Sequence, residues 1–144
     1  MVDLTGDIYR EAGPQENIDV LVNGQTPTES TTGPDWLTFG FDSTLPVGEQ
    51  PIRAAAPGHL SCEGTLNLTA GENTLSQLIA LLSGDADGDD VVNIRDATIV
   101  SLAWNTSGTP GHNDDFNADG TINVLDLIEI GRNFDQVGPQ PCQP

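Results

Sequence analysis

Lysine is absent from this sequence, and four arginines are the only residues with a permanent positive charge. Against them stand 22 Asp and Glu residues, so the formal net charge is −18 at pH 7. Such a chain repels the phosphates of nucleic acids and the headgroups of anionic membranes, so both are poor partners and we expect no nucleic-acid binding. No apolar run approaches the length of about 18 residues that a membrane-spanning helix needs.

Residues that commonly carry catalysis are also scarce. The GxSxG, HExxH and glycine-rich phosphate-binding motifs of common enzyme classes are missing. The two histidines stand alone: His59 follows Pro-Gly, and His112 lies in a Gly/Pro/Asn-rich stretch. We expect both on surface loops and predict that the protein is not an enzyme.

The two cysteines, Cys62 and Cys142, lie far apart and have no CxxC partner or neighbouring base. We interpret them as a disulfide that ties the C-terminal tail to the first half of the chain, with two buried free thiols as the alternative. A bridge across so long a loop would contribute about 4 kcal/mol in the chain-entropy model.

Two acidic stretches of twelve residues, 85–96 and 115–126, are the most informative part of the sequence. Each has oxygen-bearing side chains at positions 1, 3, 5, 9 and 12, and position 7 would add its backbone carbonyl, which is the spacing of a calcium-binding loop. For a single stretch the alternative is an ordinary turn-rich loop, because Asp, Asn and Gly are common turn formers. Their gapless repetition favours two bound calcium ions. The predicted ligands are Asp85, Asp87, Asp89, Val91, Asn93 and Asp96 in the first loop, and Asp115, Asn117, Asp119, Thr121, Asn123 and Asp126 in the second.

A helical pattern of apolar residues follows each loop. We expect the two apolar stripes to be buried in a core, either against each other or against a neighbouring part of the chain. We also expect Val92 and Ile122, at position 8 of the two loops, to pair the loops through a short strand contact. The stripes are Ile94, Ala97, Val100 and Trp104, and Val124, Leu127, Ile130 and Phe134.

This duplicated loop–helix unit resembles the dockerin family over about residues 83–136. The resemblance implies the ten side-chain calcium ligands named above, and it implies docking onto cohesin modules in extracellular assemblies that often degrade polysaccharide. Position 6 of the first loop is Asp90 where the family usually has glycine, so we expect slight strain there. Positions 10 and 11, often Ser-Thr in the family, are Ile94-Arg95 and Val124-Leu125, and these four residues are the candidate partner face.

Residues 1–82 show the alternation of a small all-β sandwich, with turn signals between the strands. This part resembles Ig-like and carboxypeptidase-regulatory-like β-domains through residues 45–52 and 56–59. Residues 75–82 have helical spacing, but we favour a strand. The fold expected is therefore an Ig-like sandwich at 1–82, a small α module of two EF-hand-like repeats at 83–136, and a disulfide-anchored Pro/Gln-rich tail at 137–144. The apolar strand positions are Val2, Leu4, Ile8, Ile18, Val20, Val22, Leu37, Phe39, Phe41, Ile52, Leu66 and Leu68.

Calcium loops, the lack of lysine and glycosylation sequons at Asn67 and Asn105 favour a location outside the cell. The first residues do not resemble a signal peptide, so we expect a processed form or part of a longer gene product. We expect foremost a self-assembling subunit of a fibre or surface structure, because sandwich edges can accept strands from other copies. The alternatives are an adaptor for a cohesin-like partner and a glycan-binding module that uses Trp36 or Trp104.

Overall fold

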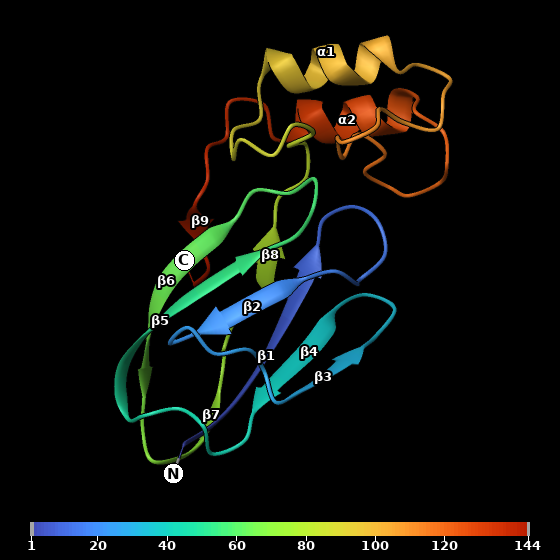
Figure 1. Cartoon of the computed structure of the whole chain (residues 1–144). Coiled ribbons are helices and arrows are strands. Elements are labelled where there is room, and N and C mark those ends of the chain that lie inside the picture. Colours follow the sequence, from blue (N-terminus) through green and yellow to red (C-terminus); the bar gives the residue numbers. More distant parts are fainter. Residues whose placement is uncertain (1, 144) are drawn as a thin grey trace.

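The computed structural model describes residues 2–143, so the first residue of the predicted sandwich and the last residue of the predicted tail lie outside it. Two β-sheets make up one end of the molecule, and two short helices lie side by side at the other end (Figure 1). The first strand starts at the end of the molecule that is farthest from the helices.

The first sheet has five strands, with β1 (Val2–Arg10) near its centre. β1 pairs antiparallel with β4 (Leu37–Phe41), which also pairs with the edge strand β3 (Glu29–Thr32). On its other side β1 pairs in parallel with both β7 (Gly71–Thr74) and β8 (Ile79–Leu81). The strand that we favoured within residues 75–82 is therefore confirmed as β8.

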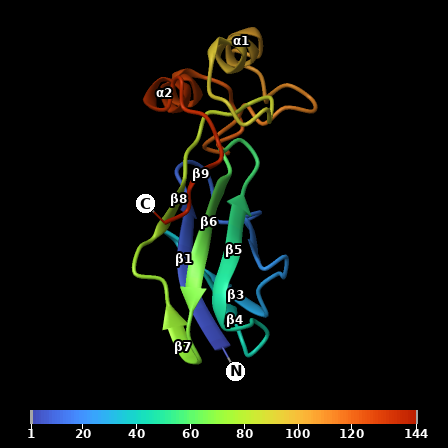
Figure 2. The ribbon, with the colours of Figure 1, turned by 90° about the vertical axis from the view of Figure 1, so that its left-hand side faces the viewer.

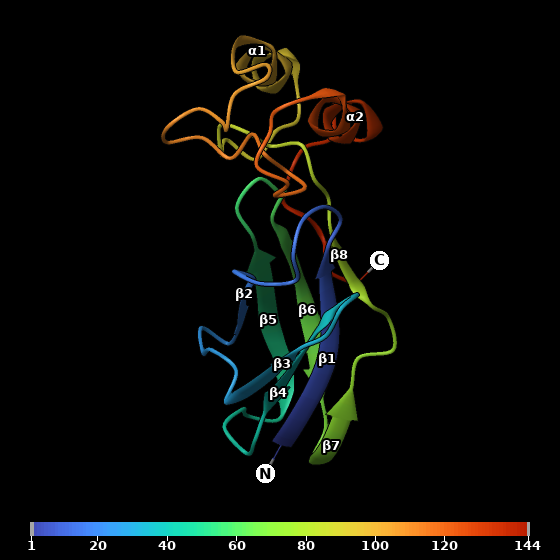
Figure 3. The ribbon, with the colours of Figure 1, turned by 90° about the vertical axis from the view of Figure 1, so that its right-hand side faces the viewer.

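The second sheet has four strands in the order β2-β5-β6-β9. β2 (Asp19–Val22), β5 (Gly48–Ala55) and β6 (Cys62–Leu68) pair antiparallel in that order, and the chain between β2 and β5 passes through β3 and β4 of the other sheet. The two-residue strand β9 (Gln140–Pro141) comes from the C-terminal tail and pairs in parallel with β6. The two sheets face each other, as the side views show (Figures 2 and 3).

Alternate residues of the strands fill the space between the sheets, as their period of two requires. Phe39 and Phe41 meet edge to face with their ring centroids 6.3 Å apart. The predicted strand positions are confirmed as core, except that Ile18 is only partly buried. The disulfide prediction is also confirmed, because Cys62 and Cys142 are bonded at the edge of this core.

The prediction of an Ig-like sandwich followed by a small α module is wrong. Ig-like sandwiches are built from antiparallel sheets, whereas here β1 lies parallel to β7 and β8, and β9 lies parallel to β6. The chain is mostly β, and its two helices have only nine residues each. Alternation and turn residues predict where strands lie, but they carry no information on which strands pair or in which direction.

The helices are α1 (Ile94–Leu102) and α2 (Val124–Arg132). Each begins with the same capping box, in which an Asn side chain accepts a hydrogen bond at the first turn and an Asp three residues later accepts from the Asn backbone. Within residues 2–143, no helix is long and apolar enough to cross a membrane.

The expected apolar stripes of the helices are only partly buried, and this prediction is wrong in most of its residues. Each helix contributes one fully buried aliphatic side chain, Val100 or Ile130, and Ala97 is half-buried. The second core is completed by loop residues and by Ala12 and Leu60 from the β part. Since the helices are short and lie on top of the loops, the other stripe residues face outward; they are Ile94, Trp104, Val124, Leu127 and Phe134.

Candidate metal centre and docking face

The first three predicted side-chain ligands of loop 1 converge in space. One carboxylate oxygen from each of Asp85, Asp87 and Asp89 lies within 4.8 Å of the others. Asp85 is buried and fixes the turn, since its Oδ1 accepts a hydrogen bond from the Gly88 backbone (2.9 Å) and its Oδ2 from the Asp90 backbone (2.9 Å). The loop therefore holds its carboxylates together through its own backbone.

Asp96, at position 12, closes the loop. Its side chain is buried, its Oδ1 accepts from the Ala86 backbone (2.8 Å), and its Oδ2 accepts from the Asn93 backbone (2.8 Å). One residue thus caps helix α1 and joins the helix to the start of the loop. In turn, the Asn93 side chain accepts from the Arg95 backbone at 2.8 Å.

Loop 2 repeats this network thirty residues later. Asp126 accepts from the backbones of Phe116 (2.9 Å) and Asn123 (3.0 Å), and Asp115 accepts from the backbone of Gly120 (2.9 Å). Most of the network is therefore repeated, whereas the bonds from Gly88 to Asp85 and from Asp87 to Asp96 are found in loop 1 alone among the described residues.

Positions 5, 6 and 7 form a turn in each loop. The position-7 residues Val91 and Thr121 donate their backbone N–H to the position-5 carboxylates of Asp89 (3.0 Å) and Asp119 (2.9 Å). Position 6 has a positive φ in both loops, +66° at Asp90 and +86° at Gly120. Aspartate tolerates this left-handed conformation better than most residues do, although glycine adopts it without cost.

The electrostatics of the loops favour a bound cation. Burial raises the pKa of Asp85 to about 7, and the neighbouring Asp96 carboxylate adds to the rise. Burial also raises the pKa values of Asp96 and Asp126. Arg95 lies 3.4 Å from Asp87 and 3.5 Å from Asp89 but is largely exposed to solvent. Clustered, partly desolvated carboxylates with only oxygen donors fit a hard cation such as calcium.

The two loops do not pair with each other through Val92 and Ile122, and this prediction is wrong. Val92 exchanges backbone hydrogen bonds with residues 135 and 136, which follow α2 (2.8 and 2.9 Å). Ile122 exchanges them with residues 105 and 106, which follow α1 (both 2.8 Å). Position 8 of each loop thus pairs with the segment that follows the other helix. The side chains of Val92 and Ile122 are both buried in one core.

An apolar surface lies over the two helices, which Figure 3 shows end-on at the tip of the molecule. Of the predicted partner face, Ile94 is 67% exposed, Val124 54% and Leu125 49%, and the Arg95 side chain is also largely exposed. Sequence reasoning missed Leu102 and Ile128, which belong to the same exposed set. Both could have been found, because each lies one or two helical turns beyond a predicted face residue.

The other predicted residues lie as follows. His112 is exposed as expected, but His59 is buried between the two ends of the molecule, so its assignment to a surface loop is wrong. Trp36 and Trp104 are both partly exposed. The sequon residues Asn67 and Asn105 are exposed, and their glycosylation stays a prediction.

Comparisons with known proteins agree with the geometry of the repeats. The model of the dockerin type I domain matches residues 83–135. These residues therefore form a dockerin module, the class of assembly module that the loop–helix duplication predicted. No curated protein matches the chain.

Two solved structures share the fold over nearly the whole chain. One is a C-terminal interface mutant of a type II cohesin–X–dockerin complex from Acetivibrio cellulolyticus, with a TM-score of 0.73. The other is an N-terminal interface mutant of the same kind of complex, with a TM-score of 0.72. Each match is 19% identical and covers 95% of this chain and 97% of the other. The β part thus shares its fold with a chain from such a complex, and an Ig-like assignment finds no support.

Proposed function

We propose that this chain is an extracellular adaptor whose calcium-loaded dockerin module binds a cohesin-type partner. The observation that carries the proposal is the exposed apolar face on two adjacent helices whose first turns are built directly onto the two acidic loops. The dockerin match and the fold shared with chains of cohesin–X–dockerin complexes support it.

Two calcium ions would be held by the ligands that the sequence predicts in the two loops. Position 1, 3 and 5 side chains supply the converging oxygens, position 12 closes the loop, and the remaining oxygens come from position 7 and position 9. The bound ion would supply the positive charge that balances these clustered carboxylates. Since position 12 also caps its helix, binding of the ion and orientation of the helix are expected to be coupled.

The docking face would be formed by Ile94, Arg95, Val124 and Leu125, extended by Leu102 and Ile128. Soluble chains rarely expose so many large aliphatic side chains together unless a partner covers them. The face is more apolar on α2 than on α1, where Arg95 and Thr98 interrupt it. We therefore expect a partner surface that is mainly apolar.

Binding to cohesin modules tests the proposal. We expect immobilised type I or type II cohesins to capture the chain in calcium and to release it in EGTA. Leu125→Asp should weaken capture at least about tenfold, because it places a charge in a desolvated contact. Leu78→Asp is the matched control, since Leu78 is an equally exposed leucine of the β part and is 46% accessible. Failure of the calcium-loaded chain to bind any cohesin of either type would contradict the proposal.

The self-assembling subunit, our first hypothesis from the sequence, has no support in the comparisons, and the adaptor fits them better. Glycan binding likewise has no support in the comparisons. Light scattering of the calcium-loaded chain separates self-assembly from the adaptor, because an adaptor without its partner should remain a monomer, whereas a fibre subunit should form growing polymers.

A further inference from the structure

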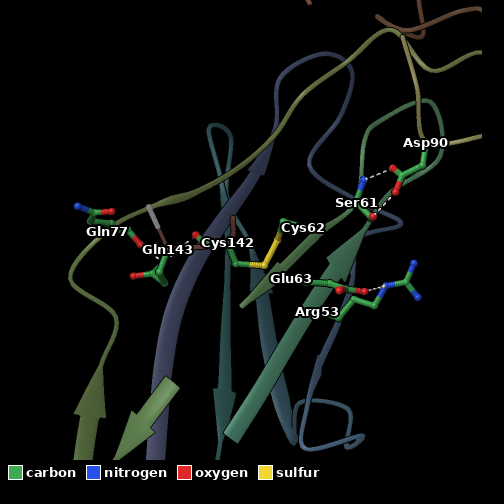
Figure 4. Close-up of a disulfide and its surroundings, with 8 residues drawn as sticks. All are labelled: Arg53, Ser61, Cys62, Glu63, Gln77, Asp90, Cys142 and Gln143. Carbon is green, nitrogen blue, oxygen red and sulfur yellow. Dashed lines mark hydrogen bonds and ion pairs between the residues drawn. A yellow bond between two sulfur atoms is a disulfide. The ribbon is translucent and has the colours of Figure 1, made fainter. Parts of the chain in front are cut away.

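Asp90, where the dockerin resemblance leads one to expect glycine, connects loop 1 to the β part. Its Oδ1 accepts a hydrogen bond from the Ser61 backbone at 2.7 Å, and its Oδ2 accepts one from the Ser61 hydroxyl at 2.6 Å (Figure 4). Ser61 is buried and directly precedes β6. The side chain at position 6 therefore binds the β part, while the carboxylates at positions 1, 3 and 5 converge on one another.

The C-terminal tail reinforces this contact. After α2 the chain pairs with Val92 and then donates from Gly138 N to the Asp90 carbonyl (2.8 Å). It continues beside β6, where Gln140 N donates to the Ser61 carbonyl (2.8 Å), and it then reaches the Cys62–Cys142 disulfide. A side chain at Gly138 would overlap the Asp90 carboxylate, so the close approach requires glycine here.

Loop 2 lacks this support at the corresponding position. Gly120 has no side chain to reach the β part, and an added Cβ would lie in open space. The residues at positions 4 to 7 of loop 2 are all exposed. Two loops with similar internal hydrogen bonds thus differ in the contact that position 6 makes with the β part.

We infer that Asp90, Ser61 and the disulfide-anchored tail form an inter-module clasp that positions loop 1 for calcium. A loop held in its binding shape loses less conformational freedom when the ion binds, and outer contacts of this kind tune metal affinity. The clasp makes the calcium affinity of loop 1 depend on Ser61 and on the tail. Loop 2 shares the core with the β part but has no such contact at its position 6, so its affinity should not respond to these residues. This inference rests on the proposed calcium binding.

Ser61→Ala is the central test, because it removes one bond to Asp90 and changes no charge. Calcium titration of the ¹⁵N-labelled full chain would follow the position-6 amides of Asp90 and Gly120 separately. We expect loop 1 to weaken roughly two- to tenfold, the effect of one net hydrogen bond, with loop 2 unchanged. Gly138→Ala should act in the same way, and Gly131→Ala is its control, since an added Cβ there meets nothing within 4 Å.

A second pair of variants separates the clasp from the charge of Asp90. Asp90→Asn and Asp90→Gly both remove the charge, but asparagine keeps an acceptor for Ser61 N, and glycine relieves the positive φ. We expect the Asp90→Gly variant to bind calcium at loop 1 more weakly than the Asp90→Asn variant does, because glycine cannot bond to Ser61. This should hold although glycine adopts the positive φ more easily. Circular dichroism in saturating calcium would establish that each variant is folded.

The outcomes discriminate between the two proposals. Two results would overturn the clasp and leave the proposed function intact. In one, Ser61→Ala changes the calcium affinity of loop 1 by less than twofold; in the other, it lowers the affinity of both loops equally. Absence of calcium binding at both loops of the unaltered chain would overturn both.

Discussion

Val92 and Ile122 occupy the same position of the two acidic loops, and each pairs through its backbone with the segment that follows the other repeat's helix. Their side chains are both fully buried in the core between the helices and the β part. Neither loop–helix repeat therefore contains the backbone partners of its own position-8 residue. The two repeats should fold and unfold as one unit.

Removal of calcium should destabilise this unit, which should still melt in a single step. Without an ion, Asp85, Asp87 and Asp89 repel one another at close range. Each bound ion adds about 2.7 kcal/mol at a calcium concentration 100 times its Kd. Thermal melts followed by circular dichroism, in calcium and in EGTA with magnesium as the control, measure the effect. Identical melts in the two solutions would contradict it.

Two isoleucines of α2 should separate stability from docking. Ile130 is fully buried and Ile128 is 50% exposed. Ile130→Ala should destabilise the module by about 2–5 kcal/mol because it leaves a cavity, whereas Ile128→Ala should change stability by no more than about 0.5 kcal/mol. Urea unfolding in calcium checks both values. Ile128→Ala should instead weaken cohesin capture, and the reverse pattern would mean that the helix faces are assigned wrongly.

Periodicity and spacing predict much of the local structure of this chain. The alternation in Val2, Leu4 and Ile8 identifies the buried face of β1, and the Asp/Asn spacing identifies both loops and their capped helices. These patterns depend on neighbours in sequence, which is why one sequence suffices to find them. The pairing of Cys62 with Cys142 was predictable for a different reason, since the chain offers no other cysteine.

Contacts between distant segments could not be predicted in the same way. Strand direction in the sheets depends on how β7, β8 and β9 return to strands far away in the chain, and no local signal encodes that. The stripes are less buried than predicted because Leu60 and Ala12 of the β part, together with loop residues, fill much of the core beneath the helices. The sequence predicts only slight strain at Asp90, because its hydrogen bonds to Ser61 join segments that are far apart in the chain.

Calcium affinity should fall as the solution is acidified below neutral pH. Burial raises the pKa of Asp85 to about 7 in the ion-free chain, so a proton competes with the ion for this carboxylate. One such proton can lower the affinity by up to about tenfold per pH unit below the pKa. Calorimetric titrations between pH 8 and pH 6 would measure the loss. Asp85→Asn should bind more weakly throughout and show a smaller dependence on pH.

The ion-free chain should respond to pH with the opposite sign. The pKa of Asp85 is higher in the folded chain than its ordinary value of 3.8, so the folded state binds the proton more tightly. The stability associated with this proton is fully present below about pH 4 and is lost as the pH rises through about 7. Melts in EGTA should therefore rise on mild acidification, and the rise should be smaller in Asp85→Asn. Equal pH slopes for the two chains in EGTA would contradict this.

Acidification should also destabilise the calcium-loaded chain through a second group, the buried His59. Its Nε2 accepts a hydrogen bond from the Ala12 backbone (3.3 Å), and its Nδ1 lies 2.9 Å from the Pro57 carbonyl, so the neutral ring with hydrogen on Nδ1 satisfies both partners. Burial is the main cause that lowers the pKa of His59 to about 4. Because the unfolded chain takes up a proton first, stability should be lost as the pH falls from about 6.5 towards 4, by roughly 3 kcal/mol in total.

Substitution of each histidine tests this assignment. His59→Gln should flatten the dependence of urea unfolding on pH between 7 and 4.5 in saturating calcium, since glutamine does not titrate. His112→Gln, at the exposed histidine, should leave the dependence as it is in the unaltered chain. If His59→Gln and the unaltered chain lost stability in parallel, the acid sensitivity would belong to the calcium ligands alone, and the junction between the β part and the dockerin module would play no part in it.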